Sequence, residues 1–347
     1  MRAFDHPLEA AHTPQFFLAR GVQLPNFEVP ARAASLRTGL TELGLTPEVP
    51  PLPGRAALER LHAPDYLDWL RDAPAAWATM PNAGAEIVGN VSLTPEMLAQ
   101  GGRRPVKPTG LAGWYTADTA CPVGPRTYEA AEAAAGCALA AAAVAAKGGA
   151  AYALARPPGH HAYAARAGGH CYVNNAALAA QALRDSGAAR VAVLDIDSHH
   201  GNGTQGMFWD RADVLTVSVH GDPNGYYPWF VGYAEERGTG PGEGCNLNRP
   251  LSIGTGDAGW LEAIAEGLSA ISTFRADALV VSLGFDASEH EPLNALQVTA
   301  DGFARAGAAI GAARLPTAIV QEGGYNVDLL GTLLARFLGA FGEKAPG

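Results

Sequence analysis

The sequence predicts an α/β fold with a mostly parallel sheet covered by helices. Short runs rich in aliphatic residues, each the length of a buried strand, alternate with segments of helical periodicity. The expected strands are 150–155, 190–196, 213–219, 277–283 and 317–321, and the expected helices between several of them are 175–186, 259–274 and 300–314. Such alternation favours right-handed β–α–β crossovers, and ligands then bind beyond the carboxyl ends of the strands.

The N-terminal third of the chain is less regular. Helices are expected at 31–43, 56–71 and 128–147, the last of them rich in alanine. Residues 72–124 carry many prolines and glycines, which predicts a long loop insertion. A loop of this length within a compact domain usually serves a function or forms an interaction surface. Since we find no internal repeat and no linker, residues 1–347 are expected to form a single domain with this insertion.

The composition narrows the classes of partner. The 347 residues carry a formal net charge of −10, which argues against unaided nucleic-acid binding because phosphate neutralisation needs clustered Lys and Arg. The four cysteines show no C-x-x-C spacing, and the N-terminus lacks the pattern of a signal peptide. The most apolar run, 137–146, is too short to span a bilayer. We therefore expect a cytoplasmic protein with neither a nucleic-acid nor a membrane partner, and a cationic ligand stays open.

Polar residues follow the expected strand 190–196 at alternating positions. Asp195, Asp197 and His199 are two residues apart, so their side chains point to one side of an extended strand. An aspartate and a histidine at this spacing can supply two ligands to one divalent metal ion. The alternative is that Asp197 caps a helix beside a core histidine, but a cap needs one acidic residue rather than this row.

A third metal ligand is expected after the apolar run 280–283. Asp286 follows this run, although an aspartate in such a place would by itself more often be a turn residue. Two carboxylates and one imidazole leave an open position for water, which is the layout of a catalytic rather than a structural zinc site. The same ligands would also accept iron or cobalt.

Three further residues at strand ends suit proton transfer and oxyanion stabilisation. His160 and His161 follow the strand 150–155 in a stiff turn that contains proline and glycine. Because adjacent side chains diverge, we expect the two histidines to serve separate proton-transfer roles rather than to bind one metal. Tyr325 follows two glycines, and its phenol could donate a hydrogen bond to a developing oxyanion. Alone, a histidine pair or a Gly-Gly-Tyr turn is more often structural.

Five ordered motifs together resemble the arginase–deacetylase superfamily. They are R-P-P-G-H-H-A (156–162), G-G-x-C-Y-x-N-N (168–175), D-I-D-S-H-H-G-N-G-T-Q (195–205), S-L-G-F-D (282–286) and E-G-G-Y (322–325). Within the superfamily the chain resembles the zinc-dependent histone deacetylase family, most closely its branch of bacterial acetylpolyamine amidohydrolases. The likeness spans nearly the whole chain and implies the arginase–deacetylase fold, a single-domain three-layer αβα architecture around a mostly parallel sheet.

The resemblance also implies a role for each matching residue. The zinc ligands would be Asp197, His199 and Asp286, and the catalytic residues would be His161 as general base, His160 as electrostatic partner or acid, and Tyr325 as oxyanion donor. Asp195 would orient His160 and lie in a monovalent-cation site, usually potassium, near Ser218. Asn202 matches a position, occupied by Asp in some members, that supports the base.

By the same resemblance, a channel leads the substrate to the metal. Its wall and mouth would include Gly169, His170, Tyr227 and Leu293. His170 stands where Phe or Tyr is usual, which would make the channel more polar and pH-responsive unless the rim simply tolerates it. Residues 108–118 contain no glutamate to meet distal ammonium groups, so Asp118 is the acidic candidate there. The related polyamine enzymes close their channel by dimerisation, so a homodimer is expected.

The sequence thus predicts a zinc-dependent amidohydrolase, with a structural potassium ion, that removes acetyl or other acyl groups from small N-acylated amines such as acetylpolyamines. Two alternatives stay open, namely a deacetylase of acetyl-lysine in proteins and a protein that binds acyl groups without catalysis. The intact His160, His161 and Tyr325 argue against the non-catalytic alternative. A binuclear manganese amidinohydrolase would need further bridging Asp and His ligands, which we do not find in the sequence.

Overall fold

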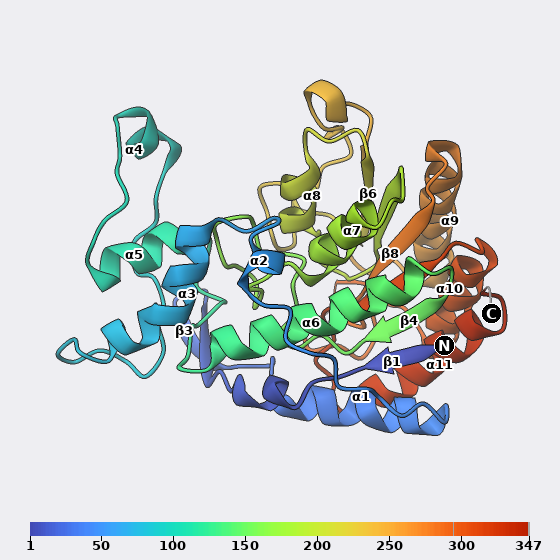
Figure 1. Cartoon of the computed structure of the whole chain (residues 1–347), viewed down its shortest axis with the longest axis horizontal. Helices are drawn as coiled ribbons and strands as arrows, with labels where there is room; N and C mark the ends of the chain where they lie inside the picture. Colours follow the sequence, from blue (N-terminus) through green and yellow to red (C-terminus); the bar gives the residue numbers. More distant parts are fainter. Residues whose placement is uncertain (294, 346–347) are drawn as a thin grey trace.

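A parallel sheet lies at the centre of the protein (Figure 1). The computed structural model describes residues 1–293 and 295–345. Within these residues the sheet has seven strands in the order β1-β4-β9-β8-β5-β6-β7, and each neighbouring pair is parallel. The strands are β1 (Arg2–Phe4), β4 (Ala150–Ala153), β5 (Val191–Asp195), β6 (Val214–Gly221), β7 (Asn246–Leu251), β8 (Ala278–Leu283) and β9 (Thr317–Gln321). A separate antiparallel hairpin joins β2 (Phe16–Ala19) and β3 (Val22–Pro25).

The five strands expected from the sequence are all present. Edge strands β1 and β7 are absent from the prediction, because β1 is only three residues long and β7 contains Asn, Arg and Pro among its six residues. Edge strands tolerate such residues because one side of the strand has no partner.

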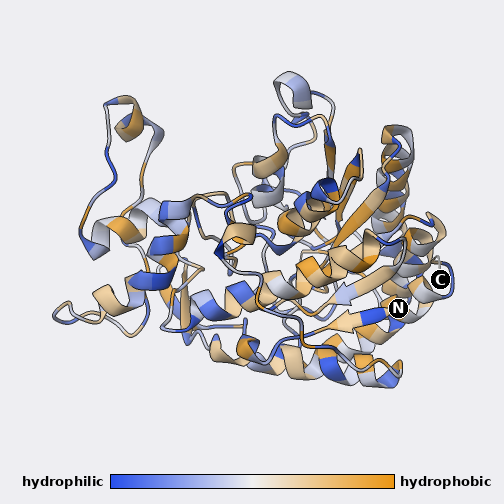
Figure 2. Ribbon diagram, viewed as in Figure 1, coloured by the Kyte–Doolittle hydropathy of each residue, from blue (hydrophilic) through white to orange (hydrophobic). Residues whose placement is uncertain are grey.

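Two helical layers cover the sheet, which confirms the predicted three-layer αβα architecture (Figure 1). One layer consists of α1 (Pro30–Glu42), α9 (Asp257–Phe274), α10 (Ala300–Ala312) and α11 (Leu330–Gly342). The other consists of α6 (Thr127–Ala145), α7 (Asn175–Asp185) and the end of α8 (Asn202–Phe208). Along β5, Ala192 and Leu194 face the first layer while Val191 and Val193 face the second. Both faces of the strand are therefore apolar, and Figure 2 shows the same hydrophobic character along β8.

Helix α6 contains most of the apolar run 137–146, and the whole helix is, by length and composition alone, long and apolar enough to cross a membrane. In the structure 61% of its most apolar window is buried inside the protein. The helix packs against α7 and β4, and its buried residues are mostly alanines. The apolar residues of α6 therefore pack into the core of the α/β fold.

The prediction of a single helix at 56–71 is wrong, because the chain forms α2 (Arg55–Leu58) and α3 (Pro64–Trp77) instead. Pro64 is the first residue of α3, where its missing N–H costs no hydrogen bond. The residue before a proline is disfavoured from the helical conformation, so the chain turns between the two helices.

The segment 72–124 is not a continuous loop. It contains the end of α3 and two further short helices, α4 (Pro95–Ala99) and α5 (Pro108–Tyr115). Figure 1 shows α4 and α5 projecting from one end of the molecule, away from the sheet. Two short 3-10 helices, η1 (Pro7–Ala11) and η2 (Gly240–Gly242), complete the described elements.

Candidate active site

The turn after β4 carries two buried histidines. Glu322, which follows β9, accepts hydrogen bonds from the backbone N–H groups of Gly159 (2.6 Å) and His160 (3.1 Å). The rings of His160 and His161 lie with their centroids 4.0 Å apart. The expectation that these adjacent side chains diverge is therefore wrong, because the expected turn brings the two rings together instead of separating them.

The two histidines have different partners and therefore different charges. His160 Nδ1 lies 2.9 Å from Asp195 Oδ2, whereas His161 Nδ1 lies 2.6 Å from Asn202 Oδ1. Burial opposes a charged His160, but the carboxylates of Asp195 and Asp197 raise its pKa well above the usual value. Burial, together with the neighbouring rings of His160 and His199, lowers the pKa of His161 well below the usual value. The surroundings therefore favour the protonated form of His160 and the neutral form of His161.

Asp197, His199 and Asp286 come together at the carboxyl ends of β5 and β8. All three are buried, and one potential ligand atom from each lies within 4.8 Å of the other two. His199 Nδ1 is 3.1 Å from Asp197 Oδ1 and 3.0 Å from Asp286 Oδ2. Backbone N–H groups orient the carboxylates, since Gly323 donates to Asp197 Oδ2 (2.8 Å) and Ser198 donates to Asp286 Oδ1 (2.8 Å).

This donor set fits a divalent metal ion. Two carboxylates buried side by side are unfavourable unless a cation compensates them. Although burial opposes it, Asp286 and Asp197 raise the pKa of His199 to about 9, which shows how strongly the site favours positive charge. Zinc binds carboxylate oxygens and imidazole nitrogens, and three protein ligands leave an open position as in catalytic zinc sites; the same donors also suit iron or cobalt.

Tyr325 lies beyond β9 on the same edge of the sheet, and 9% of its surface is exposed. The guanidinium carbon of Arg32 is 4.9 Å from the centre of its ring. Arg32 also donates hydrogen bonds to the backbone oxygens of Gly324 (2.5 Å) and Glu322 (2.6 Å). Burial raises the pKa of Tyr325 well above its usual value, so the phenol keeps its proton and remains a hydrogen-bond donor.

Most residues predicted for the channel also lie beside the histidines. The ring of Tyr227 meets the ring of His161 edge-on at a centroid distance of 4.8 Å. Gly169 is close to the same two residues, because a Cβ placed there would overlap the His161 ring and lie 3.0 Å from the Tyr227 hydroxyl oxygen. His170 is buried, with its ring 5.9 Å from that of Tyr325 and its backbone at a φ of +66°.

The two other predicted channel residues contribute through polar contacts. The Asp118 carboxylate accepts hydrogen bonds from the Tyr227 hydroxyl (2.6 Å) and the Gly169 N–H (3.0 Å). Leu293 is half-buried, and its backbone oxygen accepts a hydrogen bond from the Tyr226 hydroxyl (2.5 Å). Tyr226 in turn stacks on His199 with a centroid distance of 4.5 Å, so Leu293 connects to the candidate metal ligands through one ring.

A profile of the family described as "Histone deacetylase domain" matches residues 26–341, which is most of the chain. The chain belongs to the histone deacetylase family. This confirms the resemblance inferred from the five motifs.

Relatives within the family match this protein over nearly its full length. An acetylpolyamine amidohydrolase of Burkholderia pseudomallei is 44% identical over 344 residues, 99% of each chain. Acetylpolyamine amidohydrolase 1 of Pseudomonas aeruginosa is 41% identical over 329 residues, 94% of each chain. A crystal structure of acetylpolyamine aminohydrolase from Burkholderia pseudomallei superposes with a TM-score of 0.96 at 43% identity and full coverage of both chains. These matches identify our chain as an amide-hydrolysing enzyme.

In this histone deacetylase-family protein, the two residues predicted to bind a monovalent cation, Asp195 and Ser218, lie next to the histidine pair, because Asp195 contacts His160. Asp195 and Ser218 are paired residues of β5 and β6. The Ser218 hydroxyl lies 2.8 Å from His220 Nδ1, and Asp195 Oδ1 accepts the N–H of Asp197 (3.1 Å). A cavity of about 10 Å³ adjoins both side chains, which is about the room that one water needs.

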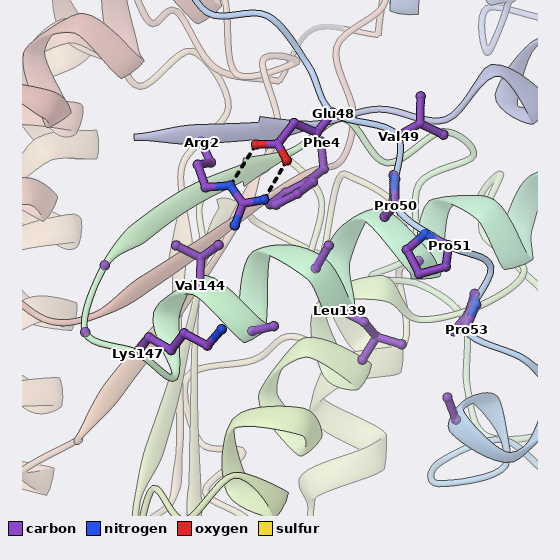
Figure 3. Close-up of a pocket in the computed structure, with 16 residues that line it drawn as sticks. Arg2, Phe4, Glu48, Val49, Pro50, Pro51, Pro53, Leu139, Val144 and Lys147 are labelled. Atoms are coloured by element: carbon purple, nitrogen blue, oxygen red, sulfur yellow. Dashed lines mark hydrogen bonds and ion pairs between the residues drawn. The ribbon is translucent and has the colours of Figure 1, made fainter.

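A much larger cavity, of about 750 Å³, lies elsewhere in the protein, between α6 and the segment 48–53 (Figure 3). Prolines and aliphatic residues dominate its lining, with the Arg2–Glu48 ion pair at one end. None of the residues predicted for the site lines it. This large cavity therefore does not coincide with the residues predicted for the site.

Sequence reasoning assigned no role to three residues that support the site. Arg32 and Glu322 are fully buried, and Glu291 is 5% exposed. Each contacts the site through residues that lie far away in the sequence, so no spacing pattern could have revealed this role. A sequence signal that could have pointed to such a residue is a charged side chain within a motif, as with Glu322, the first residue of E-G-G-Y.

Proposed function

We propose that this protein is a zinc-dependent amidohydrolase that removes acetyl groups from N-acetylated polyamines or similar small N-acyl amines. The convergence of three metal donors, a neutral histidine and a phenol at one edge of the sheet carries this proposal. The full-length relatives are named acetylpolyamine amidohydrolases, which supports acetylpolyamines as the substrate class.

Asp197, His199 and Asp286 would hold the zinc ion. When bound, zinc supplies Lewis acidity that polarises an acyl carbonyl and lowers the pKa of a water molecule. The open face of a three-ligand site leaves room for both.

His161 serves as the general base. A proton on its Nδ1 is donated to Asn202 Oδ1, 2.6 Å away, which leaves Nε2 free to accept the proton of the attacking water. The low pKa of His161 keeps the ring neutral before the reaction. His160, kept charged by Asp195 and Asp197, stabilises the developing negative charge and favours protonation of the leaving amine.

Tyr325 donates a hydrogen bond to the oxyanion that forms on the substrate. Its raised pKa keeps the phenol protonated, and Arg32 fixes the turn from which the ring projects. Loss of an oxyanion donor typically costs about 2.7–4 kcal/mol, so Tyr325→Phe should lower kcat by about 100- to 1000-fold.

The proposal includes a homodimer. Met97, Leu98 and Val106, in the segment 72–124, are 51%, 48% and 83% exposed, and Phe230, three residues after Tyr227, is 88% exposed. Covering these apolar side chains would remove them from water, which favours association. A second copy that covers them would narrow access to the channel and favour thin, flexible substrates.

The proposal also includes a potassium ion at Asp195 and Ser218 and a cytoplasmic location. The oxygen atoms of these two residues on neighbouring strands support a hard cation. All four cysteines, which lie in the described part of the chain, are free thiols, as is usual in a reducing compartment.

The test compares turnover of N8-acetylspermidine, acetylputrescine and an acetyl-lysine peptide by zinc-loaded protein, with His161→Ala as the inactive control. We expect kcat/KM for the acetylated amines to exceed that for the peptide by at least about tenfold. A preference for the peptide would instead make the protein a lysine deacetylase. Binding of zinc and ligand without turnover of any of the three would make it a non-catalytic acyl-binding protein.

A further inference from the structure

The turn that carries Tyr325 relies on side chains for its shape. Residues 322–326 lie outside helices and strands, and Gly324 has a φ of +114°. Buried backbone N–H groups in such a turn need partners from other parts of the chain. The groups that provide them determine where the phenol points.

Glu291 provides two of these partners. Its Oε2 accepts the N–H of Tyr325 (2.8 Å), and its Oε1 accepts the N–H of Asn326 (3.0 Å). Only 5% of Glu291 is exposed. One buried carboxylate therefore holds two consecutive peptide groups, one of them that of Tyr325.

Arg32 holds the same turn from its carbonyl side. Its guanidinium donates to the backbone oxygens of Gly324 and Glu322, and its charge lies over the Tyr325 ring. Arg32 can bind only acceptors, so it cannot hold the N–H groups of the turn. Glu291 and Arg32 are thus complementary, and each fixes a side of the turn that the other cannot.

We propose that Glu291 is a positioning residue of the hydrolytic reaction, which holds the Tyr325 phenol in the orientation that donation to the oxyanion requires. The inference rests on the role of Tyr325 in the proposed function. Burial raises the pKa of Glu291 to about 7, so the carboxylate is kept at a cost in stability. The two hydrogen bonds that the Glu291 carboxylate accepts stabilise the turn.

The test compares Glu291→Gln with Glu86→Gln. Glu86 is a matched control, because it is 7% exposed and accepts a backbone N–H, that of Gln15 (2.9 Å), outside the candidate site. Gln at 291 can accept only one of the two N–H groups, so the turn should shift. We expect kcat for an acetylated amine to fall about 10- to 100-fold, with KM and zinc content unchanged. Glu86→Gln should retain the wild-type kcat.

A double-mutant cycle separates positioning from general structural support. If Glu291 acts through the phenol, adding Glu291→Gln to Tyr325→Phe should lower kcat by less than about threefold more. Glu291→Asp keeps both acceptor oxygens on a shorter side chain, so it should recover part of the lost kcat. An unchanged kcat in Glu291→Gln, or the same fold loss in the Tyr325→Phe background, would overturn the proposal.

A spectroscopic measurement keeps this test independent of the proposed function. With 3-fluorotyrosine at position 325, Glu291→Gln should shift or broaden the fluorine resonance, whereas Glu86→Gln should leave it unchanged. An unchanged resonance in Glu291→Gln also contradicts the proposal. If wild-type protein hydrolyses none of the three substrates, the proposed function fails, and the resonance still shows whether Glu291 sets the place of the ring.

Discussion

The Tyr227 hydroxyl donates a hydrogen bond of 2.6 Å to the carboxylate of Asp118. The same carboxylate oxygen accepts the N–H of Gly169, and the other accepts the N–H of Ala120 (2.7 Å). Both oxygens of Asp118 are therefore engaged within the protein. The side chain joins the Gly169 and Tyr227 walls of the proposed channel, and an ammonium group of a substrate would have to share it with these donors.

This contact predicts that Asp118→Ala raises KM more than it lowers kcat. The substitution removes a charged acceptor from both walls, and hydrogen bonds to charged groups are worth about 1.5–3 kcal/mol each. We expect KM for an acetylated amine to rise at least about tenfold, as measured by steady-state kinetics. Asp185→Ala, which removes an exposed ion pair with Arg60, is the control and should change KM by less than about twofold. A selective loss of kcat in Asp118→Ala would contradict the prediction.

The central strands could be predicted because their residues are apolar, as burial on both faces of the sheet requires. In β8, residues Ala278–Leu283 are almost all apolar, since helices cover both faces of the sheet. The edge strand β1 has three residues and no such run, so only its pairing with β4 makes it a strand. Likewise, the break between α2 and α3 depends on Pro64. The prediction of a single helix followed the helical periodicity of 56–71 and gave too little weight to this proline.

The clustering of the proposed metal ligands could be predicted because the strand topology places them at one edge of the sheet. Parallel strands β5 and β8 are neighbours, so Asp197 and Asp286, which follow them, must lie close together. Glu291 and Arg32 could not be found in this way. Their contacts with the turn of Tyr325 arise only when two distant segments pack on it, and neither segment has a repeating pattern that shows this.

The close approach of Gly323 to the two carboxylates proposed as metal ligands predicts that Gly323→Ala abolishes metal binding. A Cβ at this position would overlap Asp286 Oδ2 and lie 2.6 Å from Asp197 Oδ2, so both carboxylates would have to move. We expect zinc content, measured on purified protein by atomic emission, to fall to background. Gly342→Ala is the control, because a Cβ there meets nothing within 4 Å. Full zinc content in Gly323→Ala would show that the carboxylates lie elsewhere.

Removal of the metal should destabilise the fold as well as stop catalysis. Without a cation, Asp197 and Asp286 are two buried carboxylates that repel each other across the cluster. A ligand present at 100 times its Kd stabilises a protein by about 2.7 kcal/mol, so a chelator should lower Tm by several degrees. Zinc, added in excess of the chelator, should restore both Tm and activity. The control is Asp286→Ala, whose Tm should not respond to the chelator, and an equal response would place the metal elsewhere.

Buried histidines should make the enzyme sensitive to mild acid, and His62 offers a test outside the candidate site. Burial lowers the pKa of His62 to about 4, whereas an unfolded histidine has a pKa of about 6.5. Between these values the unfolded chain binds more protons, so stability falls as pH falls, by up to about 1.4 kcal/mol per pH unit for this residue. His62 Nε2 accepts the N–H of Asn174 (2.9 Å), a bond that the amide oxygen of Gln can replace. In urea denaturation between pH 7 and pH 5, His62→Gln should therefore lose less stability than wild type. Parallel losses would show that folding leaves the pKa of His62 unchanged and would contradict the prediction.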